Sequence, residues 1–158
     1  MTEGTRWQFV GFVAALVVLH FVLRYGMGLG NLSPDLVLVA VLLTAQRVRP
    51  GRAAGIGFFL GVLVGAVSGY SLGADALALT VLGFLGARLR DVIGGESPVV
   101  LALYLFAGKW LYDLVVYLAL ATTATAGPAA VLLLPALAAA VYAALAGVAA
   151  AQAYRAVV

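Results

Sequence analysis

The positions of the charged residues constrain this chain more than any other feature of its sequence. It has nine Lys and Arg residues, and eight of them, all arginines, lie at the ends of long apolar segments. The ninth, Lys109, lies inside an apolar segment, one helical turn before Asp113. Long apolar segments separated by short charged turns are typical of a protein that crosses a membrane several times.

The composition supports this interpretation. Apolar residues make up 65% of the 158 residues and charged residues only 9%, against about 45–50% and 25% in typical soluble domains. A globule of this size cannot hide so much apolar surface from water, whereas a bilayer accepts it. The basic residues are dispersed, so no nucleic-acid-binding patch is predicted. The absence of Cys excludes disulfides and zinc–thiolate sites.

We predict an all-α polytopic membrane protein with one transmembrane domain over residues 1–158, a bundle of six helices. The expected spans are about 7–24, 34–46, 53–70, 73–87, 98–120 and 128–151. Two of them have the same start signal, Ser33-Pro34-Asp35 and Ser97-Pro98, with Ser as the N-cap and Pro at the first helical position.

The arginines predict the orientation of the bundle. With six spans, one side of the membrane receives Arg24 alone, and the other receives Arg6, Arg47, Arg49, Arg52, Arg88, Arg90 and Arg155. Short loops rich in Arg and Lys stay in the cytoplasm, so both termini are expected to be cytoplasmic. A five-span model would scatter these charges over both faces.

Lys109, Tyr112 and Asp113 form the conspicuous polar feature inside a predicted span. A lone charge at the centre of a bilayer costs about 2.5–3.5 kcal/mol on insertion scales, and pairing lowers that cost. The favoured interpretation is an ion pair that fixes packing within the bundle, and a polar cavity or partner-binding site is the alternative. A proton or ion pathway is disfavoured, because such relays need further acids and no other acid is expected at mid-span.

A series of glycines at steps of four residues marks the third span and the turn after it: Gly57, Gly61, Gly65, Gly69 and Gly73. Small residues four apart let two helix backbones approach closely. We expect them to pack against a neighbouring span. The alternative is a groove for the helix of a partner protein.

Four polar residues are expected near the outer ends of the spans: His20, Asp35, Tyr70 and Asp75. Asp35 and Asp75 are most simply residues at helix starts, where the N-terminal dipole stabilises a carboxylate, but the four could also line one outer pocket. No Ser-His-acid set, metal-ligand cluster or nucleotide-binding loop is found in the sequence. We therefore expect no enzymatic activity, no cofactor and no metal.

The order of these motifs resembles the MreD family, the small membrane subunits of the bacterial rod (cell-elongation) complex. The resemblance covers about residues 33–90. It rests on the Pro-Asp-plus-aliphatic start of the second span at 33–39, the basic turn at 47–52, the glycine-rich hairpin at 55–77, and Gly83-Phe84-Leu85-Gly86-Ala87-Arg88. One departure is Gly65, because family members often carry an Asp at this position.

The resemblance implies a non-enzymatic scaffold in the bacterial inner membrane that helps to control cell shape and peptidoglycan synthesis. The implied partner is an MreC-like protein with one membrane helix, which connects it to MreB, RodA and a class B penicillin-binding protein. A homodimer is left open. The family is also similar in fold to the substrate-binding S components of energy-coupling-factor vitamin transporters. An S component is therefore the main alternative function, and a small ion or proton transporter is the third.

Overall fold

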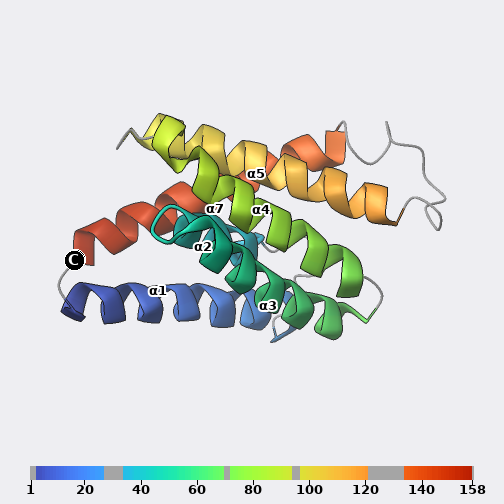
Figure 1. The fold of residues 1–158 in the computed structure, drawn as a ribbon, viewed down its shortest axis with the longest axis horizontal. Helices are drawn as coiled ribbons and strands as arrows, with labels where there is room; N and C mark the ends of the chain where they lie inside the picture. The colour runs from blue at the N-terminus through green and yellow to red at the C-terminus, as the bar shows by residue number, and fades with distance from the viewer. Residues whose placement is uncertain (1–2, 27–33, 70–71, 94–96, 121–133, 158) are drawn as a thin grey trace.

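The structure, a computed structural model, describes residues 3–26, 34–69, 72–93, 97–120 and 134–157 (Figure 1). Within these ranges the chain forms helices joined by short turns, without β-strands. The elements are α1 Glu3–Phe21, a π-helical turn Val22–Gly26, α2 Leu36–Ala45, α3 Pro50–Ser68, α4 Leu72–Ile93, α5 Pro98–Ala119 and α7 Leu134–Val157. The predicted all-α class is thus confirmed for the described ranges. Residues 128–133 of the expected sixth span lie outside them.

Four helices extend beyond the predicted spans. Helix α1 begins at Glu3 and not at residue 7, and α7 ends at Val157 and not at 151. Likewise, α3 begins at Pro50 and not at 53, and α4 continues to Ile93 and not to 87. Pro at the first position is compatible with a helix because it lacks only an N–H that has no partner there. Arg90 lies in the last turn of α4, where the helix dipole favours a cation. The basic residues here therefore do not mark the ends of the helices.

The start of α2 also differs from the expectation. Asp35 is the N-cap, with φ −79° and ψ 71°, and makes no capping hydrogen bond through its side chain. Pro34 and Asp35 therefore precede the helix instead of forming its first turn, and Ser33 lies outside the described residues. At the other predicted start, Ser97 is the N-cap of α5 and Pro98 its first residue, as expected.

Helix α2 is the centre of the bundle. All ten of its residues are buried, and it contacts each of the five other α-helices in the described part of the chain. Leu38 and Leu42 belong to the largest apolar core, together with Leu79 of α4 and Leu105 of α5. In Figure 1, α2 lies between α1 on one side and α4 and α5 on the other.

Helices α3 and α4 form a closely packed hairpin. A Cβ on Gly57 would collide with the backbone carbonyl of Leu79, and a Cβ on Gly61 would lie 2.5 Å from the Ala76 Cα. From the opposite side, a Cβ on Gly83 would collide with the carbonyl of Ala53. Only glycine allows the two backbones to approach this closely.

In the part of the chain that the structure describes, four helical segments are long and apolar enough to cross a membrane: Trp7–Arg24, Pro50–Ser68, Pro98–Ala119 and Pro135–Ala156. Their outward faces carry large apolar side chains, for example Phe59, which is 74% exposed, and Leu145, which is 66% exposed. Faces of this kind are stable in lipid and not in water. The structure therefore indicates a membrane protein, with α2 as a shorter apolar helix inside it.

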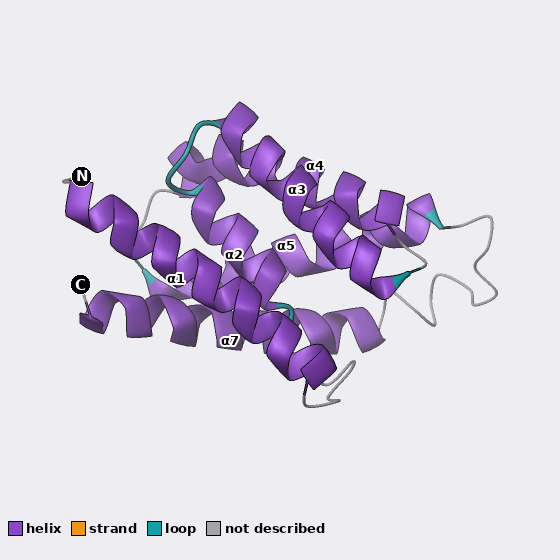
Figure 2. Ribbon diagram, turned by 90° about the horizontal axis from the view of Figure 1, so that it is seen from below, coloured by secondary structure: helices purple, strands orange, loops and turns teal. Residues whose placement is uncertain are grey.

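The described arginines, apart from Arg24, gather at one end of the bundle. Arg47 in the turn after α2 contacts Phe9 near the start of α1 and Tyr154 near the end of α7. Arg49 and Arg52 lie at the start of α3, which packs beside the late part of α4. The start of α1 and the end of α7 lie at this same end (Figure 2). Arg24, in the π-helical turn, lies at the far end of α1.

Candidate functional site: a buried polar cluster

Lys109 is the centre of a polar cluster inside the bundle. Its Nζ donates to Asp113 Oδ1 at 2.5 Å, one turn further along α5. The same Nζ lies 3.5 Å from Asp35 Oδ2, at the N-cap of α2. The side chains of the three residues are only 11%, 18% and 19% exposed for Lys109, Asp35 and Asp113. One ammonium group thus links two helices through two carboxylates.

Tyr112 adds a third helix to the cluster. Its hydroxyl donates to Asp75 Oδ1 at 2.5 Å, and Asp75 lies in the first turn of α4. The Lys109 Nζ lies 4.8 Å from the centre of the Tyr112 ring, within the range of a cation–π interaction. Because Tyr112 lies between Lys109 and Asp75, it connects the ion pair of α5 to α4.

His20 brings α1 to the same region. It is only 1% exposed, and its Nδ1 lies 3.4 Å from the carbonyl oxygen of Pro34, the residue before Asp35. If Nδ1 carries the proton that this contact needs, Nε2 is a bare acceptor. Within the described part of the chain Nε2 has no hydrogen-bond partner. We call His20, Asp35, Asp75, Lys109, Tyr112 and Asp113 the polar cluster.

The polar cluster lies near the middle of the bundle's depth. Helix α2 begins beside it and ends next to Arg47 at the basic end. Ten helical residues cover about 15 Å, roughly half of the 30 Å hydrocarbon core of a bilayer. The N-terminus of α2 therefore points its positive dipole end at the carboxylate of Asp35, deep in the protein.

The charges of the cluster do not balance. Three carboxylic acids face one ammonium group, and the helix dipole at α2 supplies only about half of a positive charge. Carboxylates that cannot all be neutralised by cations must share protons or hydrogen bonds, and the Tyr112 hydroxyl supplies one such bond to Asp75. The arrangement can hold two helices to α5, and it can also carry a proton.

The structure joins two sites that the sequence predicted separately. The intramembrane pair of Lys109 and Asp113 is formed, and Asp35 and Asp75, expected at an outer pocket, belong to the same cluster. The expectation that no other acid lies at mid-span was wrong. Helix α2 is so short that its N-cap, Asp35, lies inside the bundle. The sequence predicts this residue at the outer surface. Tyr70, the fourth residue of the expected outer pocket, lies outside the described residues.

The glycine series is divided by the structure. Gly57, Gly61 and Gly65 are buried on the inner face of α3, so this stripe packs against α4 and is closed to a partner helix. Gly69 is the C-cap of α3 with a left-handed φ of 80°, a conformation that favours glycine. Gly73 lies in α4, as the predicted fourth span implied, and a Cβ there would meet nothing within 4 Å.

Metal ligation finds no support in the described ranges, where no group of three or more His, Cys, Asp or Glu residues could hold an ion. Comparison with protein-family models, curated proteins and solved structures finds no match to this chain.

Proposed function

We propose that the chain is a non-enzymatic scaffold of the bacterial cell-elongation complex, which binds an MreC-like protein within the inner membrane and so influences cell shape and peptidoglycan synthesis. The motifs at residues 33–90 support the family. Six spans with cytoplasmic termini fit the gathering of arginines at the end where α1 starts and α7 ends. MreB, RodA and a class B penicillin-binding protein are indirect partners.

One observation carries this proposal furthest: the polar side chains inside the bundle are bonded to one another. Lys109 is held by Asp35 and Asp113, and Tyr112 is bonded to Asp75. An S component needs such groups to face its substrate. Here the polar side chains connect α2, α4 and α5 to one another. This arrangement favours a scaffold, a rigid bundle that binds its partner through its outer faces, over a substrate-binding protein.

Helix α1 offers the most accessible docking face for a single partner helix. Among the described helices it packs chiefly on α2. Gly11 and Ala15 are exposed one turn apart, and a Cβ on Gly11 would meet nothing within 4 Å. A helix can approach closely over small residues, and the glycine stripe of α3 is already covered by α4.

The test is affinity purification of the tagged chain from its native cells in mild detergent, with mass spectrometry of the bound proteins. Recovery of a one-helix protein with a periplasmic coiled coil, together with wall-synthesis enzymes, supports the scaffold. Recovery of two ATPases with a coupling membrane subunit would identify a vitamin transporter instead. Gly11→Leu should reduce recovery of the one-helix partner, whereas Ala149→Leu, an exposed position on α7, should not.

A second candidate function, proton or ion transport, is favoured by the excess of acids in the polar cluster and by Nε2 of His20, which has no hydrogen-bond partner among the described residues. The purified chain in liposomes that contain a pH-sensitive dye tests it. Proton flux that is present in the wild type and lost in Asp113→Asn, with folding retained, would favour transport. A wild type no leakier than empty liposomes would exclude proton transport.

A further inference from the structure

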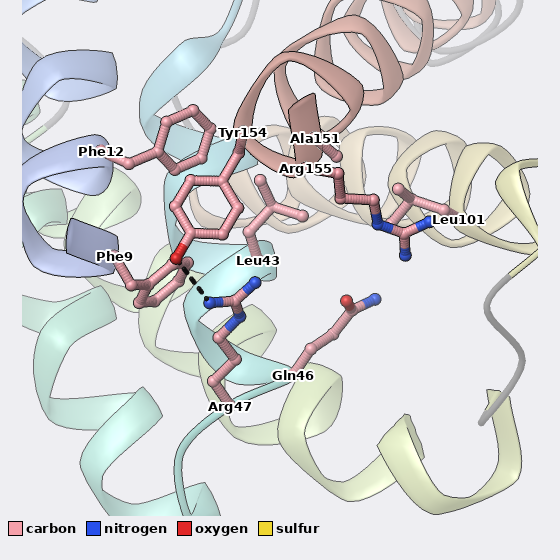
Figure 3. Close-up of a pocket in the computed structure, with 9 residues that line it drawn as sticks. All are labelled: Phe9, Phe12, Leu43, Gln46, Arg47, Leu101, Ala151, Tyr154 and Arg155. Atoms are coloured by element: carbon pink, nitrogen blue, oxygen red, sulfur yellow. Dashed lines mark hydrogen bonds between the residues drawn. The ribbon is translucent and has the colours of Figure 1, made fainter. Parts of the chain in front are cut away.

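A small cavity opens at the basic end of the bundle, far from the polar cluster. It lies between α1, α2, α5 and α7 and measures about 50 Å³ (Figure 3). One water molecule needs roughly 10–15 Å³ on the same measure, so the cavity holds a group of a few heavy atoms. From the sequence alone, the arginines around it indicate only membrane topology.

The rim of the cavity is cationic. Arg47 and Arg155 both line it, and none of its nine lining residues is acidic. Figure 3 shows the Gln46 amide and the Arg155 guanidinium at the same opening as Arg47. Two guanidinium groups and an amide N–H₂ match the oxygen atoms of a phosphate, which guanidinium groups bind through paired hydrogen bonds.

Aromatic side chains hold Arg47 at this rim. Its guanidinium carbon lies 3.9 Å from the centre of the Phe9 ring and 4.9 Å from that of Tyr154, and Nη1 donates to the Tyr154 hydroxyl at 3.4 Å. Stacking occupies the faces of a guanidinium group and leaves its edge N–H groups available. Within the described residues, Arg47 forms no ion pair with a carboxylate. Among the described residues, its charge is therefore held in place by aromatic rings and a hydroxyl and not by a carboxylate.

The floor of the cavity is apolar. It is formed by Phe12 of α1, Leu43 of α2 and Leu101 of α5. A free phosphate ion gains nothing from an apolar floor, whereas a phospholipid places its glycerol and acyl carbons directly below its phosphate. In a membrane-spanning bundle, a basic pocket between helices at the headgroup level is suited to an anionic lipid.

We infer that this cavity is a binding site for the phosphate group of an anionic phospholipid, with Arg47 and Arg155 as its cationic ligands. The site stands apart from the scaffold proposal, because it depends on neither the polar cluster nor a protein partner. Lipid at this position contacts α1 and α7 together, and so connects the two terminal helices of the bundle.

Native mass spectrometry of the delipidated chain in detergent tests the inference, with dioleoyl phosphatidylglycerol and dioleoyl phosphatidylcholine as probes. The wild type should retain one phosphatidylglycerol in preference to phosphatidylcholine. Each of Arg47→Gln and Arg155→Gln should weaken its binding about 5-fold, and the double variant about 30-fold, from roughly 1 kcal/mol for each charge. The matched control Arg49→Gln/Arg52→Gln removes the same charge at the same end, outside the cavity lining, and should bind as the wild type does.

Equal retention by the wild type and the Arg47→Gln/Arg155→Gln variant would overturn the inference, and so would an equal loss in the control. Displacement of the lipid by millimolar glycerol 3-phosphate would assign the site to free phosphates instead. Circular dichroism establishes that each variant is folded. If Arg47→Gln does not fold, Ala151→Leu replaces it, because it fills the cavity and keeps both charges. Its retention of phosphatidylglycerol should fall, and unchanged retention would contradict the site.

Discussion

Asp35 and Lys109 form an ion pair between the N-cap of α2 and the middle of α5, with Asp35 Oδ2 and Lys109 Nζ 3.5 Å apart. Because Lys109 also binds Asp113 at 2.5 Å, a single cation holds the buried end of the central helix to its neighbour. Breaking a buried pair leaves an uncompensated charge, which is costly in a low-dielectric interior.

Replacing the cation should therefore destabilise the bundle strongly. We expect Lys109→Met to lower the free energy of unfolding by about 3–5 kcal/mol, measured in detergent by circular dichroism. The double variant Lys109→Met/Asp35→Asn should recover part of the loss, because one of the two stranded carboxylates is gone. Additive effects of the two substitutions would show that the pair makes no energetic contribution.

The hydrogen bond from Tyr112 to Asp75 gives a second prediction. Tyr112→Phe removes the hydroxyl that reaches α4 and should cost about 1.5–3 kcal/mol, the range for hydrogen bonds to charged groups. Tyr142→Phe is the matched control, because Tyr142 is 48% exposed, and it should change stability by less than about 0.5 kcal/mol. Similar losses in both variants would mean that the hydroxyl of Tyr112 has no special role.

The α3–α4 contact gives a third prediction. A methyl group at Gly61 would lie 2.5 Å from backbone atoms of Asp75 and Ala76, which cannot move without separating the helices. We expect Gly61→Ala to cost about 1–3 kcal/mol, as overpacking does. Gly55→Ala, in the same helix with nothing within 4 Å, should be neutral or stabilising by up to about 1 kcal/mol. Thermal unfolding of the two variants provides the comparison.

The core around α2 gives a fourth prediction. Leu38 is 0% exposed and Leu145 is 66% exposed. Leu38→Ala should cost about 2–5 kcal/mol because it leaves a cavity. Leu145 faces outward, toward lipid or detergent, in the folded protein, so Leu145→Ala leaves no internal cavity. It should lower the free energy of unfolding by less than about 0.5 kcal/mol. Equal losses in an unfolding titration would show that α2 is not the packed centre of the bundle.

The sequence predicted the local features correctly where a local cause decides them. Pro98 starts α5 because proline fixes a helical φ and its missing N–H is not needed there. Lys109 and Asp113 meet because residues four apart share a helix face. Gly57 and Gly61 pack against another helix because small residues permit close approach. These inferences need the helix geometry and nothing beyond it.

The surroundings of α2 could not be predicted in this way. Its sequence, LVLVAVLLTA, is apolar on every side, and a helix facing lipid is as apolar as one buried among helices. The periodicity therefore carried no sign that α2 is central or that its N-cap lies at mid-depth. For the same reason Asp35 was placed at an outer surface, and its ion pair with Lys109 was missed.

The sequence by itself determined that the chain is helical and suited to a membrane. It also determined which ends of the apolar segments are basic and which charged residues inside them needed a partner. The tertiary structure alone decided which residues those partners are. It brought Asp35, Asp75 and Lys109 into one cluster, and Arg47 and Arg155 to one cavity. Helices form through hydrogen bonds between residues close in sequence. The contacts between these side chains depend instead on how the apolar helices pack against one another. Because helix surfaces that face lipid and helix surfaces that face other helices are equally apolar, no short stretch of sequence specifies that packing.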